Sequence, residues 1–267
     1  MFDVDGVLVD TAASYNEAVV RTVRWLIPGA PVDHAAIRLW KRSGDWNNDW
    51  DLAYGLYCWL LGPDGQSSAT AARRPLAELV AAAGPRAERR YAVVQGIFEE
   101  HYNGTARAVA RYGVRPFVGN EDPLADRERV MLEPAHIAEL QAAGVRRFGV
   151  VTGRARADWA QVAARLPLPP DTAVATDEDG RKPDPAGLAL VLDRLAASGF
   201  VLIGDTLNDL RMVQAYANAD RVPGQAVILC EPEDENGYRA AGATTFVRSL
   251  GDLVATVRAM GTTAPRY

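Results

Sequence analysis

The chain has 267 residues, of which 48% are hydrophobic and 24% charged, a composition typical of a globular protein and unlike that of a disordered chain. This length suits one large domain or a core domain with a second module, and we expect two modules. The formal net charge of -5 gives no overall basic field, which argues against nucleic acid as a partner.

Cysteine content and hydropathy indicate the compartment. The chain has two cysteines, Cys58 and Cys230, far apart in sequence, so we expect neither a disulfide framework nor a thiolate metal site. No apolar run approaches the roughly 20 residues that span a bilayer. Acidic residues stand near the start, where a signal peptide carries basic ones. We therefore expect a cytoplasmic protein that does not bind membranes.

The first predicted element is a short strand over residues 1–4 that leads into the segment DVDGVLVDT. Asp3 and Asp5 lie two residues apart, which along a strand brings both side chains to one side, and Gly6 permits a sharp turn. Paired carboxylates suit metal binding together with nucleophilic or acid–base work. The alternative is a solvated acidic turn without a catalytic role.

A long stretch from about residue 12 to residue 111 shows no clear strand pattern and is predicted to be mostly helical. Asp33 is a plausible N-cap for a helix through Trp40, and a second helix is expected over residues 49–61. Residues 62–70 are predicted to form a loop, and a long helical pattern covers residues 86–111. Residues 114–129 are predicted to return the chain to the core.

The remaining elements alternate between strand and helix, which predicts an α/β fold with a parallel sheet. Strands are expected at residues 148–151, 172–175, 201–203 and 226–229, and helices at 155–166, 185–197 and 208–217. Ligands of such sheets bind beyond the carboxyl ends of the strands. One site could therefore draw on side chains that are distant in sequence.

Three segments that follow predicted strands carry residues suited to phosphate chemistry. The hydroxyl of Thr152 and the backbone at Gly153 can hold a phosphate oxygen, although Thr152 could instead cap a helix. Lys182, in GRKPDP, can offset phosphate charge, although a lysine there could also be a solvated loop residue.

The segment IGDTLNDL places Asp205 at the end of a strand and Asp209 in the first turn of a helix. Carboxylate oxygens favour a hard cation such as Mg2+, whereas the three scattered histidines give no zinc cluster. Asp209 could alternatively act only on the helix dipole.

In this order and spacing, the four segments resemble the four motifs of the haloacid dehalogenase (HAD) superfamily, subfamily I, in which a helical cap is inserted after the first motif. The resemblance covers residues 1–11 and 133–260 directly. It implies a HAD-like, Rossmann-like α/β core domain formed by residues 1–11 and 115–267, and a mostly helical cap domain formed by residues 12–114. Only Met1 and Phe2 precede Asp3, fewer apolar residues than this superfamily usually has there. We therefore expect either a start further upstream or a short, weakly paired first strand.

The resemblance also implies a role for each of the motif residues. Asp3 would attack phosphorus, and Asp5 would protonate the leaving oxygen and then activate water. Thr152 and Lys182 would hold the phosphoryl group. Mg2+ would be bound by Asp3, Asp205 and the backbone carbonyl of Asp5, while Asp209 would support the metal shell or orient Lys182.

The implied activity is a Mg2+-dependent phosphatase that hydrolyses a small-molecule phosphate ester through an aspartyl phosphate. Dehalogenases of the superfamily lack an aspartate at the position of Asp5, so this residue favours phosphoryl chemistry. A phosphomutase of the same superfamily is the alternative, and a phospho-accepting regulatory domain is a second one. Either a monomer or a homodimer is compatible with the sequence.

The segment KRSGDWNNDWD, residues 41–51, is unusually dense in Trp, Asn and Asp. Indole faces pack against sugar or cyclitol rings and amides bind hydroxyl groups, so we predict substrate contacts from Lys41, Asn47 and Asn48. The alternative is that the tryptophans here form part of the cap interior and that Asp49 caps a helix.

Overall fold

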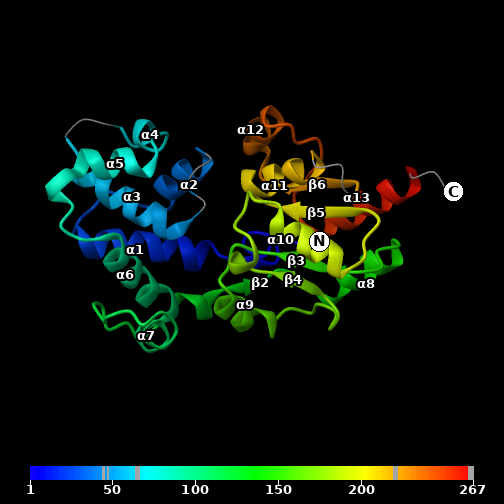
Figure 1. Ribbon diagram of the computed structural model, residues 1–267, viewed down its shortest axis with the longest axis horizontal. Helices are drawn as coiled ribbons and strands as arrows, with labels where there is room; N and C mark the ends of the chain where they lie inside the picture. The colour runs from blue at the N-terminus through cyan, green and yellow to red at the C-terminus, as the bar shows by residue number, and fades with distance from the viewer. Residues whose placement is uncertain (44–45, 47, 64–66, 219–221, 264–267) are drawn as a thin grey trace. The chain divides into compact units, whose positions relative to one another are not determined.

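The computed structural model describes residues 1–43, 46, 48–63, 67–218 and 222–263 (Figure 1). The chain divides into two compact units. Residues 1–10 and the chain from residue 129 onward form one, here called the core unit, and residues 11–128 form the other, here called the helical unit.

The core unit is built on a parallel sheet whose centre is the first segment of the chain. Phe2 forms parallel bridges with Val150 on one side and Ile203 on the other. This joins two sets of paired strands into the order β4, β3, Phe2, β5, β6, β7. The strand bounds are β3 Gly149–Val151, β4 Ala173–Ala175, β5 Phe200–Gly204, β6 Gly224–Leu229 and β7 Phe246–Val247. The first strand is thus reduced to bridges around Phe2.

Helices cover both faces of this sheet because successive strand residues point to opposite sides. Val150 belongs to an apolar cluster with residues of α8, α9 and α13, whereas Val151 belongs to a cluster with residues of α10 and α11. These helices are α8 Pro134–Ala142, α9 Arg156–Ala163, α10 Ala186–Arg194, α11 Leu207–Ala217 and α13 Leu250–Thr263, with the shorter α12 at Glu235–Ala240. Short 3-10 turns lie at Asp177–Asp179 and Pro232–Asp234.

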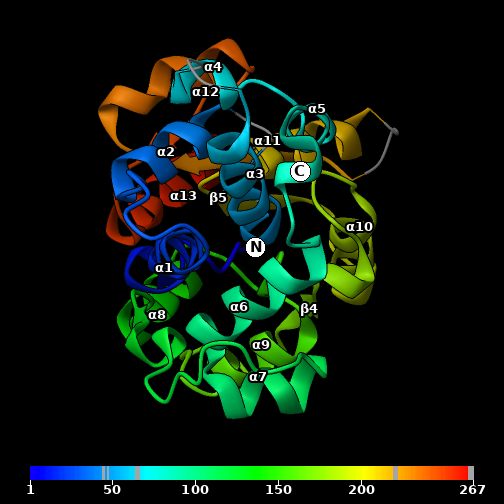
Figure 2. The same cartoon turned by 90° about the vertical axis from the view of Figure 1, so that its left-hand side faces the viewer.

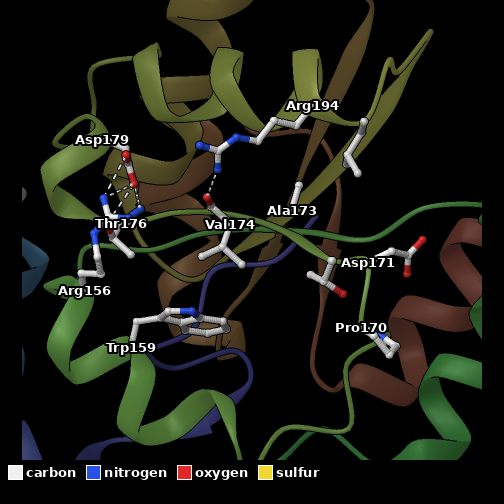
Figure 3. A pocket seen from close by; sticks show the side chains of 11 residues that line it. Arg156, Trp159, Pro170, Asp171, Ala173, Val174, Thr176, Asp179 and Arg194 are labelled. Atoms are coloured by element: carbon white, nitrogen blue, oxygen red, sulfur yellow. Dashed lines mark hydrogen bonds and ion pairs between the residues drawn. The ribbon is translucent and has the colours of Figure 1, made fainter.

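Strand β4 forms one edge of the sheet, and a groove of about 550 Å³ follows it (Figure 3). The amide of Ala173 and the carbonyl of Ala175 bond toward β3, so the backbone groups of Val174 point outward. Arg194 donates from Nη1 to the carbonyl of Val174 at 2.7 Å, and Trp159 lies beneath the strand in the same view. The outward carbonyl of the edge strand is therefore already bonded within the chain.

A short antiparallel ladder lies where the chain leaves and re-enters the core unit. In it β1, Val9–Asp10, pairs with β2, Arg129–Val130. Arg129 also pairs with the Asp10 carboxylate at 3.2 Å.

The helical unit contains seven α-helices among its described residues, and α1, α3 and α6 pack against one another (Figure 2). Its interior includes the fully buried Trp40 and Trp46. The elements are a π-helical turn Ala12–Asn16, then α1 Glu17–Leu26, α2 His34–Arg42, α3 Asp49–Leu61, α4 Ser68–Ala71, α5 Leu76–Ala83, α6 Tyr91–Asn103 and α7 Thr105–Tyr112, with 3-10 turns at Gly84–Arg86 and Leu124–Arg127.

Several sequence predictions hold in this unit. No described residue between 12 and 111 is in a strand. Asp33 caps α2 by accepting from the amide of Ala36 at 2.8 Å, and α3 has the predicted bounds. The predicted loop over residues 62–70 is wrong at its end, because Ser67 caps the short helix α4.

The helical pattern over residues 86–111 is divided between two helices, α6 and α7. Gly104 has a φ of 77°, a conformation that ends α6, and α7 starts anew at Thr105.

The return segment groups with the helical unit rather than with the core as expected from the sequence. Residues 115–128 fall in the helical unit by their contacts. The physical reason is the buried carboxylate of Glu100, which accepts hydrogen bonds from the backbone amides of Phe117, Val118 and Gly119. The boundary therefore lies after Glu128 and not after residue 114.

Within the described part of the chain, no helix combines the length and the apolar character needed to cross a bilayer.

Candidate active site

The first strand delivers Asp3 directly to the carboxyl edge of the sheet. Phe2 is held between β3 and β5, and the amide of Asp3 bonds to the carbonyl of Ile203 at 2.9 Å. The Asp3 side chain is 7% exposed, and its Oδ1 accepts from the amide of Val4 at 2.7 Å. The backbone around this carboxylate is bonded on both sides, because the carbonyl of Phe2 also accepts from the amide of Val151.

Gly6 is required by the turn that follows. Its φ is +72°, and a Cβ on it would come within 2.0 Å of Oδ2 of Asp205. Any other residue would therefore displace the Asp205 carboxylate as well as strain the backbone. Gly6 therefore allows the first motif segment to pack directly against Asp205 of the fourth.

Thr152 lies at the end of β3 and is 1% exposed. Its amide bonds to the carbonyl of Ala175, and its hydroxyl accepts from the amide of Arg154 at 3.1 Å. It does not cap α9, whose N-cap is Ala155. Gly153 is exposed, and nothing lies within 4 Å of where a Cβ would stand. The loop after β3 thus has the open backbone that phosphate binding needs.

Lys182 joins two of the predicted carboxylates. Its Nζ lies 2.7 Å from Oδ1 of Asp3 and 2.7 Å from Oδ1 of Asp209. Burial works against its charged form, but the carboxylates of Asp209 and Asp3 outweigh it and raise the pKa of Lys182 above its usual value. The lysine is therefore charged and buried, not a solvated loop residue.

Asp209 has both carboxylate oxygens engaged. Oδ1 accepts from Lys182, and Oδ2 accepts from the amide and hydroxyl of Thr206 at 3.1 and 2.6 Å. Thr206 in turn caps α11, so the two residues form a reciprocal capping box. Of the roles considered for Asp209, this geometry supports orientation of Lys182.

The aspartates at this edge form a set that fits a hard cation. Asp3, Asp205 and Asp209 each offer a carboxylate oxygen, all within 4.8 Å of one another. Oδ1 of Asp205 is buried and, among the described residues, has no hydrogen-bond partner. Such an orphaned carboxylate oxygen beside two others is the donor set that Mg2+ prefers.

Burial and the local balance of charge both indicate that the carboxylates of this site lack enough positive charge nearby. Burial raises the pKa of Asp3 to about 7 even though Lys182 opposes the shift, and burial with the neighbouring Asp3 raises that of Asp205 well above its ordinary value. With all four ionised, the aspartates Asp3, Asp5, Asp205 and Asp209 would carry twice the charge of the two cations in contact with them, Lys182 and Arg154. A divalent cation would neutralise the remainder.

Asp5 forms an ion pair with Arg154, a residue that the sequence patterns did not identify. Arg154, 3% exposed, donates from Nε and Nη2 to Oδ1 of Asp5 at 2.9 and 2.6 Å. No pattern marks this residue, because an arginine after a glycine at a strand end usually belongs to a solvated loop. Its position directly after the predicted phosphate-binding residues was the one available signal.

A second residue missed from the sequence supports the Asp205 loop. The hydroxyl of Tyr238, in α12, donates to the backbone carbonyl of Asp205 at 2.5 Å.

The residues predicted from the Trp- and Asn-rich segment have local structural partners in the helical unit. Lys41 pairs with Asp49 at 2.8 Å, and Asn48 caps α3 by accepting from the amide of Asp51. Trp46 is buried and donates to the carbonyl of Ala72. Asn47 lies outside the described residues. These contacts favour the structural alternative for Lys41, Asn48 and Trp46, and substrate contact from this segment stays a prediction.

Comparison with known proteins agrees with the architecture. A curated relative, imidazoleglycerol-phosphate dehydratase from Phytophthora nicotianae, is 28% identical over 214 residues, which are 79% of this chain but 39% of that protein. The chain thus spans about two fifths of that relative's length.

Solved structures share the fold. Phosphatase Tt82 from Thermococcus thioreducens superposes with a TM-score of 0.60 at 22% identity, over 91% of this chain and 98% of that chain. A Thermotoga maritima protein assigned as a beta-phosphoglucomutase gives a TM-score of 0.54 at 18% identity, over 97% of each chain.

The family comparison covers the four motif segments. The model of the haloacid dehalogenase-like hydrolases matches residues 1–216, which include the four motif segments and Arg154. This match confirms the resemblance and the α/β fold expected from the sequence. The chain belongs to the haloacid dehalogenase-like hydrolase family.

Proposed function

We propose that this protein is a Mg2+-dependent phosphatase that hydrolyses a small organic phosphate monoester through an aspartyl phosphate on Asp3. The observation that carries the proposal is Lys182, whose Nζ lies 2.7 Å from the carboxylates of both Asp3 and Asp209. A buried carboxylate cannot approach a phosphate dianion unless cations offset the repulsion. The site supplies one such cation and a set of oxygen donors for another.

The proposed reaction has two steps. In the first, a carboxylate oxygen of Asp3 attacks phosphorus, the ester P–O bond breaks, and the leaving oxygen takes a proton from Asp5. In the second, water attacks the phosphorus of the aspartyl phosphate and gives a proton to Asp5. The Asp3 carboxylate leaves, and inorganic phosphate is released.

The roles of the other residues follow from their contacts. Lys182, held by Asp209, would contact the phosphoryl oxygens as charge develops on them, and Thr152 with Gly153 would bind another oxygen. Asp3, Asp205 and the backbone carbonyl of Asp5 would hold Mg2+, with Asp209 supporting them. Bound there, Mg2+ neutralises charge between the nucleophile and the phosphate.

The substrate class proposed is a hydroxylated small molecule, such as a sugar or cyclitol phosphate. A test panel should contain sugar, cyclitol, nucleotide and small-acid phosphates. It should also contain imidazole glycerol phosphate, because one relative is named for that compound.

The test is phosphate release from this panel with Mg2+, comparing the native chain with Asp3→Asn. We expect release that is abolished by the substitution and by a chelator. Release that is unaffected by Asp3→Asn would refute the proposed nucleophile.

The same assay separates the two alternatives. A phosphomutase would convert a sugar phosphate to its isomer with little free phosphate. A phospho-accepting regulatory domain would accumulate a long-lived phosphoprotein.

A further inference from the structure

Arg154 is a buried cation that takes no part in the two proposed reaction steps. Its side chain is 2% exposed, whereas that of Asp5, with which it pairs, is 30% exposed. Two of its nitrogens, Nε at 2.9 Å and Nη2 at 2.6 Å, donate to the same oxygen of Asp5. A planar group that binds one carboxylate oxygen through two donors restricts the rotation of that carboxylate.

The backbone of Arg154 is fixed as firmly as its side chain. Its amide donates to the hydroxyl of Thr152 at 3.1 Å, and its carbonyl accepts from the amide of Asp177 at 3.1 Å. Asp177 begins the short turn that precedes the Lys182 loop. Arg154 therefore contacts two of the four motif segments, the first through Asp5 and the second through Thr152, and also the turn that leads to the third.

Asp5 lies outside the regular strands of the sheet, where an isolated bridge to Val9 holds its backbone and Gly6 after it has a left-handed conformation. Its side chain is 30% exposed, against 7% for that of Asp3, so it is the less enclosed of the two carboxylates. A group that transfers protons must be held within hydrogen-bond reach of the oxygen it serves. An error of about 1 Å in such a position can cost roughly a hundredfold in rate.

We propose that Arg154 is the positioning residue for Asp5, holding its carboxylate where it serves the leaving oxygen and the attacking water. The inference rests on the proposed phosphatase reaction. A positioning residue differs from a phosphate-binding residue in the kinetic effect of its loss. Loss of Arg154 should lower kcat and leave KM nearly unchanged. Lysine at this position would keep the charge but lose the two-donor geometry.

The test is a double-mutant cycle between Arg154→Gln and Asp5→Asn, measured as steady-state phosphate release. We expect Arg154→Gln to lower kcat by about 10- to 100-fold with KM within about threefold. In the Asp5→Asn background the same change should have almost no further effect, because Arg154 acts through Asp5. Arg154→Lys should recover part of the lost kcat.

Arg156→Gln is the matched control. Arg156 lies two residues along the chain, its side chain is 65% exposed, and it pairs with Asp179 instead of with Asp5. We expect wild-type kcat and KM from this variant. Thermal melting of each variant shows whether the fold is retained, and Arg154→Lys keeps the test open if Arg154→Gln does not fold.

The outcomes separate the two proposals. Additive losses in the cycle, an unchanged kcat in Arg154→Gln, or an increase in KM alone would overturn the positioning role while leaving the phosphatase proposal intact. A native chain that releases no phosphate, or one indifferent to Asp3→Asn, would overturn the phosphatase proposal and the positioning role together.

Discussion

Replacing Glu100 by Gln tests whether one buried carboxylate anchors the return segment to the helical unit. Glu100 is fully buried at the end of α6. Its carboxylate accepts from the hydroxyl of Thr105 at 2.7 Å and from the three successive backbone amides of residues 117–119. Burial alone would raise its pKa, but these hydrogen bonds outweigh burial and lower the pKa of Glu100.

The amide of Gln keeps one acceptor oxygen and turns NH2 donors toward backbone amides that are themselves donors. At least one buried amide loses its partner, at about 1–3 kcal/mol, and the remaining bonds lose their charge assistance. We expect the free energy of unfolding to fall by about 3 kcal/mol. The loss should be largest at neutral pH. Because the folded pKa is lowered, the carboxylate stabilises the fold above the ordinary glutamate pKa, and this contribution disappears as the pH falls through the folded value.

The assay is urea unfolding followed by tryptophan fluorescence, because most of the tryptophans lie in this unit. Glu88→Gln is the control, since Glu88 is exposed in the same unit and should change the unfolding free energy by less than about 0.5 kcal/mol. A loss equally small in Glu100→Gln would refute the reasoning, because the return segment would then be held by other contacts.

Three further predictions follow from the same structure. Lys182→Met should lower phosphate release by at least about 1000-fold, because Asp3 and Asp209 lose the cation between them; activity within tenfold of wild type would contradict this. Tyr238→Phe should weaken Mg2+ binding, measured by calorimetry, by about tenfold, since the carbonyl of Asp205 loses its hydroxyl partner; unchanged affinity would exclude a supporting role. Burial lowers the pKa of His101 to about 4, so the unfolded chain binds a proton that the folded chain does not. Stability should therefore fall as the pH drops from about 6.5 to 4, and His101→Gln should flatten this dependence in unfolding titrations at several pH values.

The core strands could be predicted because strands buried on both faces are continuous apolar runs, as at residues 148–151. The motif aspartates could be predicted to meet because the carboxyl ends of parallel strands share one edge of the sheet. β7 has no comparable pattern, since two residues, Phe246 and Val247, are too short a run to recognise.

Other features depend on contacts that no local pattern encodes. Arg154 reaches Asp5 across 149 positions in sequence, and only the folded sheet brings them together. Residues 115–128 carry turn signals that fit a linker to either unit, and the choice is made by the Glu100 carboxylate. In the helical unit, the tryptophans of the segment over residues 41–51 include Trp46, which is buried in the interior against Trp40. The residue types Trp and Asn in a sequence indicate the size and polarity of a side chain, but they do not indicate the direction in which it points.

The hydrogen bond from Arg194 to the carbonyl of Val174 bears on how this protein behaves at high concentration. A bare edge strand is a template on which a neighbouring molecule can add its own strand, the first step toward aggregates. With its outward carbonyl occupied and an arginine lying across it, β4 offers an incoming strand a charge and one fewer acceptor. Growth of the sheet into a second molecule is thereby disfavoured at this edge.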